Sequence, residues 1–169
     1  MSEPLVQLTY ASQANFTSNN QGGVETEVAR ILLQSRRNNP KQKLGGVLHF
    51  GNGYFFQCLE GERDVVTAAY ERIAKDPRHT RVQMLSLNTL QRRRFQDWSM
   101  KYVALDSDIQ ALLTRHNLKA FDPYAFNEEL IEKLIDLFAG AADHEDYAPA
   151  NPGYAKSKPS WWARLLGKS

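Results

Sequence analysis

The chain has 169 residues, of which 42% are hydrophobic and 24% are charged, which is typical of one folded domain with an extension. The formal net charge of +2 is too small to argue for nucleic acid or a membrane as partner, and no apolar run approaches the ~18–20 residues of a membrane span. The single cysteine, Cys58, excludes an internal disulfide, and the N-terminal MSEPLVQL is not a signal peptide. We therefore expect a cytoplasmic protein.

The first elements are a strand and a helix joined by a polar loop. Residues Leu5–Tyr10 alternate between apolar and polar positions, which predicts a strand whose inward row ends in Tyr10. Residues 12–23 are rich in Asn, Ser and Gly and predict a loop. Apolar residues then recur at helical spacing from Val24 to Arg37, and this helix must end before Pro40, because the residue before a proline avoids the α region.

The next stretch, LGGVLHFGNGYFFQCLEG at 44–61, predicts a β-hairpin. Two β-rich runs, Val47–Phe50 and Tyr54–Leu59, flank the turn signal Gly51-Asn52-Gly53. Side chains alternate along a strand, so Gln57 shares a face with two large apolar residues. A buried amide without a hydrogen-bond partner costs roughly 2–7 kcal/mol. Gln57 therefore either lies on an open face of the sheet or hydrogen-bonds to a polar group inside, and this stretch alone favours neither.

The pattern continues with a helix and two strands. A helix is predicted over Glu62–Lys75 and ends at Asp76-Pro77-Arg78-His79. Strands are predicted over Val82–Leu90 and, more briefly, over Trp98–Val103. The order βαββαββ predicts an α+β protein with a ferredoxin-like sheet and two helices on one face, which would enclose a slot.

The chain changes character after Asp106. Helices are predicted over Asp108–His116, capped by Asp106-Ser107, and over Phe126–Phe138. The second helix has a strong apolar stripe, which must bury against the open face of the sheet or against another subunit. The remaining residues are polar and rich in proline, and we expect a loose tail with a short amphipathic end. We therefore divide the chain into a domain at 1–105, a helical extension at 106–140 and a tail at 141–169.

Several kinds of chemistry find no support. The four histidines lack ligand spacing and one cysteine cannot form a thiolate site, so we expect no metal. The hairpin glycines precede a strand rather than a helix, unlike those of a phosphate-binding loop. The run Arg92-Arg93-Arg94 is more typical of a solvated loop than of a nucleic-acid contact. No pairing of nucleophile and base is apparent, so we expect no enzyme.

Polar side chains nevertheless converge on the predicted slot. They come from strands and from the ends of both helices: Tyr10, Ser35, Asn38, Asn39, Gln57, Arg78, His79, Trp98 and Met100. Tyrosine, amide and guanidinium groups can satisfy the edge of a planar heterocycle that carries donors and acceptors. Apolar side chains from the helices can hold the faces of such a ring. The pattern indicates a ligand between the helices.

Five segments, taken in order, resemble the BLUF family, the sensors of blue light that use FAD, from Leu5 to about Tyr102. They are Tyr10-Ala11-Ser12, Ser35-Arg36-Arg37-Asn38-Asn39, the hairpin residues Gly46-Val47-Leu48 with Phe55-Phe56-Gln57-Cys58-Leu59-Glu60-Gly61, Asp76-Pro77-Arg78-His79, and Arg94-Phe95-Gln96-Asp97-Trp98-Ser99-Met100. Each segment is weak alone, but their order and spacing make the set specific. Gly45 stands where the family more often has threonine, and the loop at 12–23 looks long.

The resemblance implies FAD as the cofactor and a light-driven mechanism. Tyr10 would give an electron and a proton to the photoexcited flavin, and Gln57 would bridge Tyr10 and the flavin edge. Rearrangement of Gln57 would change hydrogen bonding and shift absorption to the red. Trp98 and Met100 would report this rearrangement, and the sequence leaves open which of the two faces the flavin in the dark.

The resemblance also implies how the flavin is held. Asn39 and Arg78 would contact opposite sides of the ring edge, with His79 nearby. Ser35 and Arg36 would lie along the ring and the ribityl-phosphate tail. The implied cofactor-binding set is Tyr10, Ser35, Arg36, Asn38, Asn39, Gln57, Arg78, His79 and Met100.

A sensor of this kind without a fused effector would signal by binding a downstream regulatory protein, and we expect a homo-oligomer, a dimer or larger, with no nucleic-acid or membrane partner. Two alternatives use the same fold. An acylphosphatase-like hydrolase would need an arginine in the loop after the first strand, where this chain has Ala11-Ser12-Gln13-Ala14-Asn15. A ligand-binding or assembly module that has lost photochemistry would not need both Tyr10 and Gln57.

Overall fold

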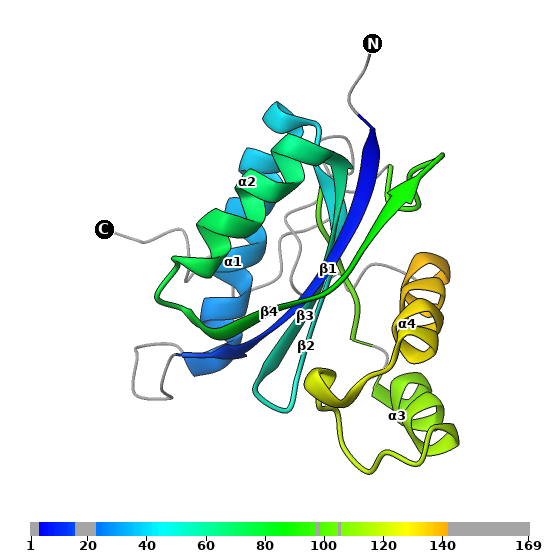
Figure 1. The fold of residues 1–169 in the computed structure, drawn as a ribbon. Helices are drawn as coiled ribbons and strands as arrows, with labels where there is room; N and C mark the ends of the chain where they lie inside the picture. The colour runs from blue at the N-terminus through cyan, green and yellow to red at the C-terminus, as the bar shows by residue number, and fades with distance from the viewer. Residues whose placement is uncertain (1–3, 16–22, 97–98, 105, 142–169) are drawn as a thin grey trace.

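The structure, a computed structural model, describes residues 4–15, 23–96, 99–104 and 106–141, and these form one five-stranded sheet with helices on both faces (Figure 1). The strands are β1 (Leu5–Ala14), β2 (Gly45–Gly51), β3 (Tyr54–Glu62), β4 (His79–Leu90) and β5 (Lys101–Tyr102). The helices are α1 (Gly23–Asn38), α2 (Arg63–Ala74), α3 (Asp106–Arg115) and α4 (Glu128–Gly140), with short 3-10 turns η1 (Asn39–Gln42) and η2 (Pro123–Ala125).

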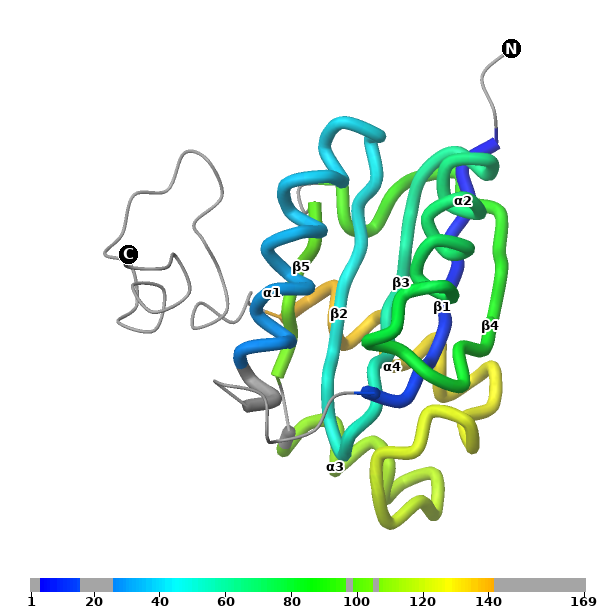
Figure 2. Tube along the Cα trace, turned by 90° about the vertical axis from the view of Figure 1, so that its left-hand side faces the viewer, coloured from blue at the N-terminus to red at the C-terminus, as the bar shows by residue number. Residues whose placement is uncertain are grey.

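The strand order is β4-β1-β3-β2-β5, in which β5 runs parallel to β2 and the other neighbours are antiparallel. Helices α1 and α2 lie side by side over one face of the sheet, and α3 and α4 cover the other face (Figures 1 and 2). The predicted α+β, ferredoxin-like arrangement with two helices on one face is therefore confirmed.

The hairpin is formed as predicted, with longer strands. Asn52 and Gly53 occupy the turn at φ +53° and +80°, values that glycine and asparagine tolerate better than other residues. The flanking strands pair from Gly51 with Tyr54 back to Gly45 with Glu60. Because this register fixes which side chains share a face, the hairpin positions Gln57 within the sheet.

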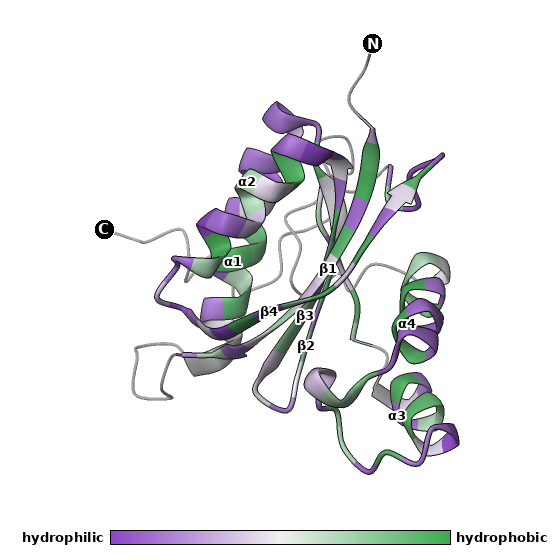
Figure 3. Ribbon diagram, viewed as in Figure 1, coloured by the Kyte–Doolittle hydropathy of each residue, from purple (hydrophilic) through white to green (hydrophobic). Residues whose placement is uncertain are grey.

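The two faces of the sheet belong to two separate apolar cores (Figure 3). Phe55 and Leu59 pack with Tyr10 and Met100 under α1 and α2. Phe56 and Cys58, the alternate residues of β3, pack instead against α3 and α4. The predicted alternation along this strand is therefore confirmed, and Gln57 points toward α1 and α2.

The apolar stripe of α4 is buried against the open face of the sheet, one of the two partners predicted for it. Leu130, Leu134 and Phe138 are at most 1% exposed and share a core with Val47 and Phe56 of the hairpin. The helix begins after Asn127, whose Oδ1 accepts a hydrogen bond from the Leu130 backbone N–H at 2.9 Å.

Some predicted boundaries were wrong. The first strand does not end at Tyr10 but continues to Ala14, because Ser12 and Gln13 still pair with Phe55 and Tyr54 of β3. The ladder between β1 and β4 compensates with two register shifts, and Arg81 at the second of these takes a φ of +52°.

Other elements start or end elsewhere than predicted. Strand β4 begins at His79, three residues earlier, because it pairs with the extended part of β1. Helix α3 already includes Asp106 and Ser107, the residues expected to cap it. Strand β5 keeps only Lys101 and Tyr102 of the predicted Trp98–Val103, and Trp98 lies outside the described residues, as do residues 142–169 of the predicted tail.

Candidate functional site

A buried chain of three side chains crosses the sheet under α1 and α2. Tyr10 on β1 lies opposite Gln57 on β3, and its hydroxyl donates a hydrogen bond to Gln57 Oε1. Gln57 Nε2 in turn donates to the sulfur of Met100 at 3.3 Å. All three side chains are at most 3% exposed. Of the two alternatives left open for Gln57, the structure therefore selects the buried one, with Tyr10 as its polar partner.

The amide of Gln57 is only weakly satisfied at its nitrogen. A thioether is a poor acceptor, so among the described residues Gln57 Nε2 donates to a weaker partner than a buried amide normally finds. The Gln57 amide would form a stronger hydrogen bond if a better acceptor on the same face of the sheet replaced the Met100 sulfur. This is the property expected of a residue that faces a cofactor edge.

Tyr10 is held in the neutral state. Burial raises the pKa of its phenol well above the ordinary value of 10.0, and the nearby negative charge of Asp76 raises it further. The ring of Tyr70 from α2 lies 5.7 Å from that of Tyr10, centroid to centroid. Tyr10 therefore keeps its proton at any working pH and offers it to Gln57.

His79 closes the same region from the start of β4. Its Nδ1 lies 2.7 Å from Ser12 Oγ, and its ring packs 4.7 Å from the ring of Phe55. Burial lowers the pKa of His79 to about 4; the negative charge of Asp76 opposes this shift, and the positive charge of Arg78 adds to it. The imidazole is therefore neutral at pH 7.

Arg78 is fixed at the end of the α2 segment by a carboxylate. Its Nη2 donates to Asp76 Oδ2 at 2.6 Å and its Nε to Asp76 Oδ1 at 3.0 Å. Burial alone would raise the pKa of Asp76, but the hydrogen bonds from Arg78 outweigh it and hold that pKa below the usual value. Nη2 also donates to Gln34 Oε1 on α1 at 2.8 Å, so Arg78 joins the loop between α2 and β4 to α1.

Two residues at the end of α1 hold the segment that leads into β5. Asn39 Nδ2 donates to the Ser99 carbonyl at 2.6 Å, and Arg36 Nε donates to the Met100 carbonyl at 2.8 Å. Asn39 is 9% exposed. These contacts place Met100 against Gln57.

The structure thus gathers part of the predicted set. Tyr10, Gln57, Met100 and His79 contact one another or adjoin, and Asn39 and Arg36 support Met100 from α1. Ser35 is half-buried in the last turn of α1, whereas Asn38 is exposed. Trp98 lies outside the described residues.

Sequence reasoning missed the partners that orient these groups. Asp76 was noted only as part of a motif, although a carboxylate two residues before an arginine is a signal for the ion pair observed. Ser12 falls in the predicted loop at 12–23, and Gln34 and Tyr70 fall inside predicted helices, where no local pattern singles them out. Ser12, Gln34 and Tyr70 act through contacts with residues at least 44 positions away in the sequence. Local sequence patterns do not reveal such contacts.

Within the described part of the chain, no group of three or more His, Cys, Asp or Glu side chains could hold a metal ion. Among the described helices, none is both long and apolar enough to cross a membrane.

Comparison with known proteins places this chain in a family. The family model for BLUF, sensors of blue light using FAD, matches residues 5–101, more than half of the chain. The chain therefore belongs to the BLUF family, whose members sense blue light with FAD.

Individual relatives agree with this placement. The chain is 38% identical over 148 residues to a photoactivated adenylate cyclase subunit beta-like protein of Euglena gracilis, covering 86% of this chain and 15% of that protein. It is 32% identical over 69 residues to the blue light- and temperature-regulated antirepressor BluF of Escherichia coli K12, covering 41% of this chain and 17% of that protein. The chain thus spans less than a fifth of the length of either relative.

A solved structure extends the likeness beyond the family match. BlsA in its photo-activated state superposes with a TM-score of 0.77 at 32% identity, covering 83% of this chain and 98% of BlsA.

The residues present fit FAD. The edge of its flavin ring carries acceptors, and the weakly satisfied amide of Gln57 is the donor in this site that most lacks one. Asn39 and Arg78 add N–H donors at the ends of α1 and α2, the two helices that flank the Tyr10–Gln57–Met100 chain. Both already bond to protein groups, and an acceptor on the ligand would share or replace those bonds.

Proposed function

We propose that this chain is a blue-light photoreceptor in which Tyr10 and Gln57 form the light-driven switch. The observation that supports it best is the buried chain Tyr10–Gln57–Met100, in which an amide is held between a strong donor and a weak acceptor. Rotation of the amide would exchange its oxygen and nitrogen, so Gln57 has a second arrangement with different hydrogen-bond partners, which light could populate.

We propose that the cofactor lies between α1 and α2 and is held from both helices. Gln57, Asn39 and Arg78 would supply N–H donors to the ring edge, with His79 beside Tyr10. Ser35, Arg36 and Asn38, from the last turn of α1, would line the ring and its phosphate tail. The apolar residues of the first core, such as Ile31 and Leu32, would contact the faces of the ring.

The switch follows from the chemistry of Tyr10 and Gln57. FAD bound between α1 and α2 would supply the chromophore for blue light and an acceptor for one electron. Tyr10 is the electron donor: as its ring loses an electron, its phenolic proton moves along the existing hydrogen bond to Gln57. When the electron returns, Tyr10 recovers a proton and Gln57 is left rotated or as its tautomer, with new partners. No bond to a substrate is made or broken, so the chain acts as a sensor and not as an enzyme.

The output of this switch is an interaction with another protein. The matched antirepressor of Escherichia coli bears a name that implies action on a repressor, and this supports a downstream regulatory protein as the partner here.

We propose residues 1–105 as the sensor, 106–140 as the helical extension that transmits the signal and 141–169 as a tail. We also expect self-association into a dimer or larger oligomer.

Absorption spectra of the FAD-loaded protein test this proposal. The wild type should be yellow and should shift reversibly to the red under blue light. Tyr10→Phe removes the donor to Gln57, and Gln57→Leu removes the amide, so both variants should bind FAD and lose the shift. Tyr124→Phe, which removes a hydroxyl bonded to the Arg81 carbonyl on the other side of the sheet, serves as the matched control and should behave as wild type. A normal red shift in either site variant contradicts the assigned roles.

A further inference from the structure

The segment that leads into β5 is held from both faces of the sheet. Among the described residues, β5 pairs Lys101 and Tyr102 with β2, and the Val103 backbone N–H donates to the Leu48 carbonyl at 3.1 Å, so backbone pairing holds this strand over a short stretch. Met100 points toward α1 and α2, where Gln57 contacts its sulfur. Lys101 is the next residue, and because side chains alternate along a strand, it points to the opposite face. A displacement of Met100 is therefore transmitted directly to Lys101.

The side chain of Lys101 reaches the last turn of α4. Its side chain is buried, with 2% of the residue exposed, and its Nζ donates to the Phe138 carbonyl at 2.8 Å and to the Ala139 carbonyl at 3.3 Å. The carbonyls in this last turn lie at the negative end of the helix dipole. The Phe138 carbonyl also accepts a hydrogen bond from the Ala141 backbone N–H, at 3.3 Å, just past the end of the helix. The ammonium therefore caps α4, and these carbonyls compensate part of the cost of burying it.

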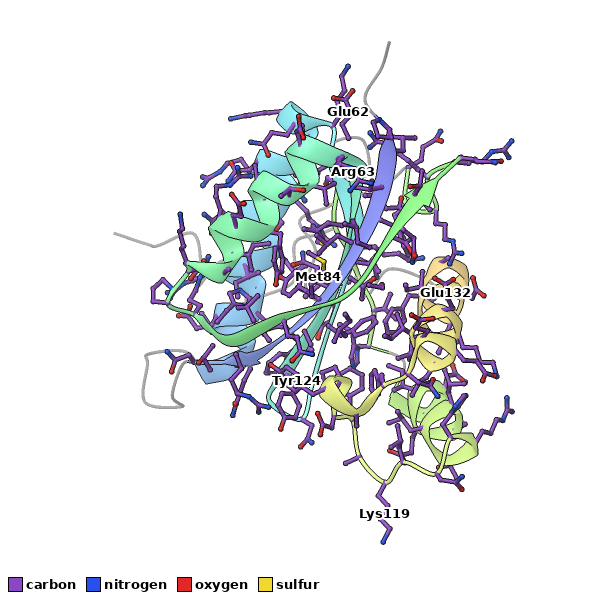
Figure 4. All side chains as sticks on the ribbon, viewed as in Figure 1. Glu62, Arg63, Met84, Lys119, Tyr124 and Glu132 are labelled. Carbon is purple, nitrogen blue, oxygen red and sulfur yellow. The ribbon has the colours of Figure 1, made fainter. Side chains whose placement is uncertain are left out.

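A second contact joins the same segment to α4, but it is exposed. The Arg94 guanidinium donates to Glu132 and Asp136, each at 3.1 Å, and these side chains are 33% to 71% exposed (Glu132 is labelled in Figure 4). Ion pairs in contact with water contribute little. Of the two contacts, the buried one made by Lys101 is therefore the one able to respond strongly to a small displacement.

We propose that Lys101 couples the rearrangement of Gln57 to the C-terminal turn of α4; the inference rests on the proposed function. Rotation of the Gln57 amide would bring its oxygen against the Met100 sulfur, and neither atom can donate a proton. The contact between Gln57 and Met100 is lost, residues 99–101 shift, and Lys101 Nζ leaves the Phe138 and Ala139 carbonyls. The last turn of α4 then loosens at the point where the chain continues into residues 142–169.

Hydrogen exchange of the full-length, FAD-loaded protein in darkness and under blue light tests this coupling. In the wild type, light should speed exchange in residues 135–141 by about tenfold, as expected for the loss of a hydrogen bond from a charged donor. Lys101→Met keeps the length and apolar stem of the side chain but removes the ammonium. This variant should keep the red shift and exchange rapidly at 135–141 in darkness and light alike.

Lys133→Met is the matched control. Lys133 lies on the same helix, but its ammonium pairs with Glu129 at 2.7 Å on the exposed side of α4. It should keep both the red shift and the light-dependent exchange. If Lys101→Met fails to bind FAD, Lys101→Gln, which keeps an N–H donor without the charge, is measured in the same way.

The outcomes separate the two proposals. A normal red shift with an unchanged light-dependent difference at 135–141 in the Lys101 variant overturns the coupling role. A wild type that shifts to the red without any change of exchange at 135–141 overturns it as well. A wild type that binds FAD without a red shift contradicts the proposed function itself.

Discussion

At the scale of single residues, the site depends on keeping polar groups neutral and paired inside an apolar core. Tyr10 and His79 are both buried, and burial pushes each away from its charged form: the pKa of the phenol is raised and that of the imidazole is lowered. Arg78 is the exception, because Asp76 compensates its charge. The residues proposed to line the cofactor edge are thus one paired cation and several neutral donors, an environment that favours rearrangement of hydrogen bonds over separation of charge.

The neutral state of His79 predicts a pH dependence of stability. Its pKa is about 4 in the folded protein against 6.5 for an exposed histidine. Between these values the unfolded chain binds a proton that the folded protein does not, so stability falls as pH falls through this window and is unaffected by His79 above it. From about pH 7.5 to about pH 5, His79 should lower the free energy of unfolding by roughly 2 kcal/mol.

Urea denaturation at the two pH values measures this effect. His79→Asn should remove that part of the pH dependence, whereas His116→Asn, at the end of α3, should keep it. Equal pH dependence in wild type and His79→Asn would show that folding does not lower the pKa of His79.

Residue patterns predicted part of this site and not the rest. The amide of Gln57 between Phe55 and Leu59 was conspicuous in the sequence, because alternation along a strand is a local property. The contact between Gln57 and Met100 could not be predicted in this way. Met100 belongs to a segment that is held by Asn39, which contacts a residue 60 positions away, and by Arg36, which contacts a residue 64 positions away. The sequence therefore left open whether Trp98 or Met100 faces the site, and the structure places Met100 on the amide.

At the scale of elements, the hairpin depends on a close approach between its strands. A side chain at Gly46 would overlap the backbone carbonyl oxygen of Cys58 on β3. The lack of a Cβ there lets β2 lie tightly beside β3, one residue away from Gln57. Glycine is consequently required at this position by packing.

Gly46→Ala should therefore lower the free energy of unfolding by roughly 3 kcal/mol, because a methyl group forces the two central strands apart. Gly140→Ala is the matched control, since a methyl group there meets nothing within 4 Å and should change stability by less than about 0.5 kcal/mol. Thermal or denaturant unfolding compares the two, and equal stability of both variants would contradict the close approach.

The errors in element boundaries share a physical cause. Local composition favoured a loop from Ser12, yet residues up to Ala14 join the sheet because β3 and β4 both offer hydrogen-bond partners there. Tertiary pairing overrides weak local propensity at strand ends. The helices were predicted more closely, because α1 and α4 each carry an apolar stripe at helical spacing that tertiary contacts reinforce.

At the scale of the whole molecule, one sheet serves two cores. The face under α1 and α2 holds Tyr10 and Gln57, the residues of the proposed switch, and the face under α3 and α4 is closed by aromatic and aliphatic side chains such as Phe56, Phe126 and Phe138. Each residue of β3 and β5 therefore borders one core while its neighbour borders the other. Two layers joined by alternating side chains give a short path from a cofactor site to a covering helix.

The central claim is that light changes the hydrogen bonding of the Gln57 amide, and infrared difference spectroscopy tests it most directly. The FAD-loaded protein, with isotope-labelled glutamine, is measured before and after blue light. We predict that one labelled side-chain carbonyl band shifts on illumination, recovers in darkness and is missing from Gln57→Leu. A red-shifted absorption spectrum without any change in the labelled glutamine bands would contradict the account.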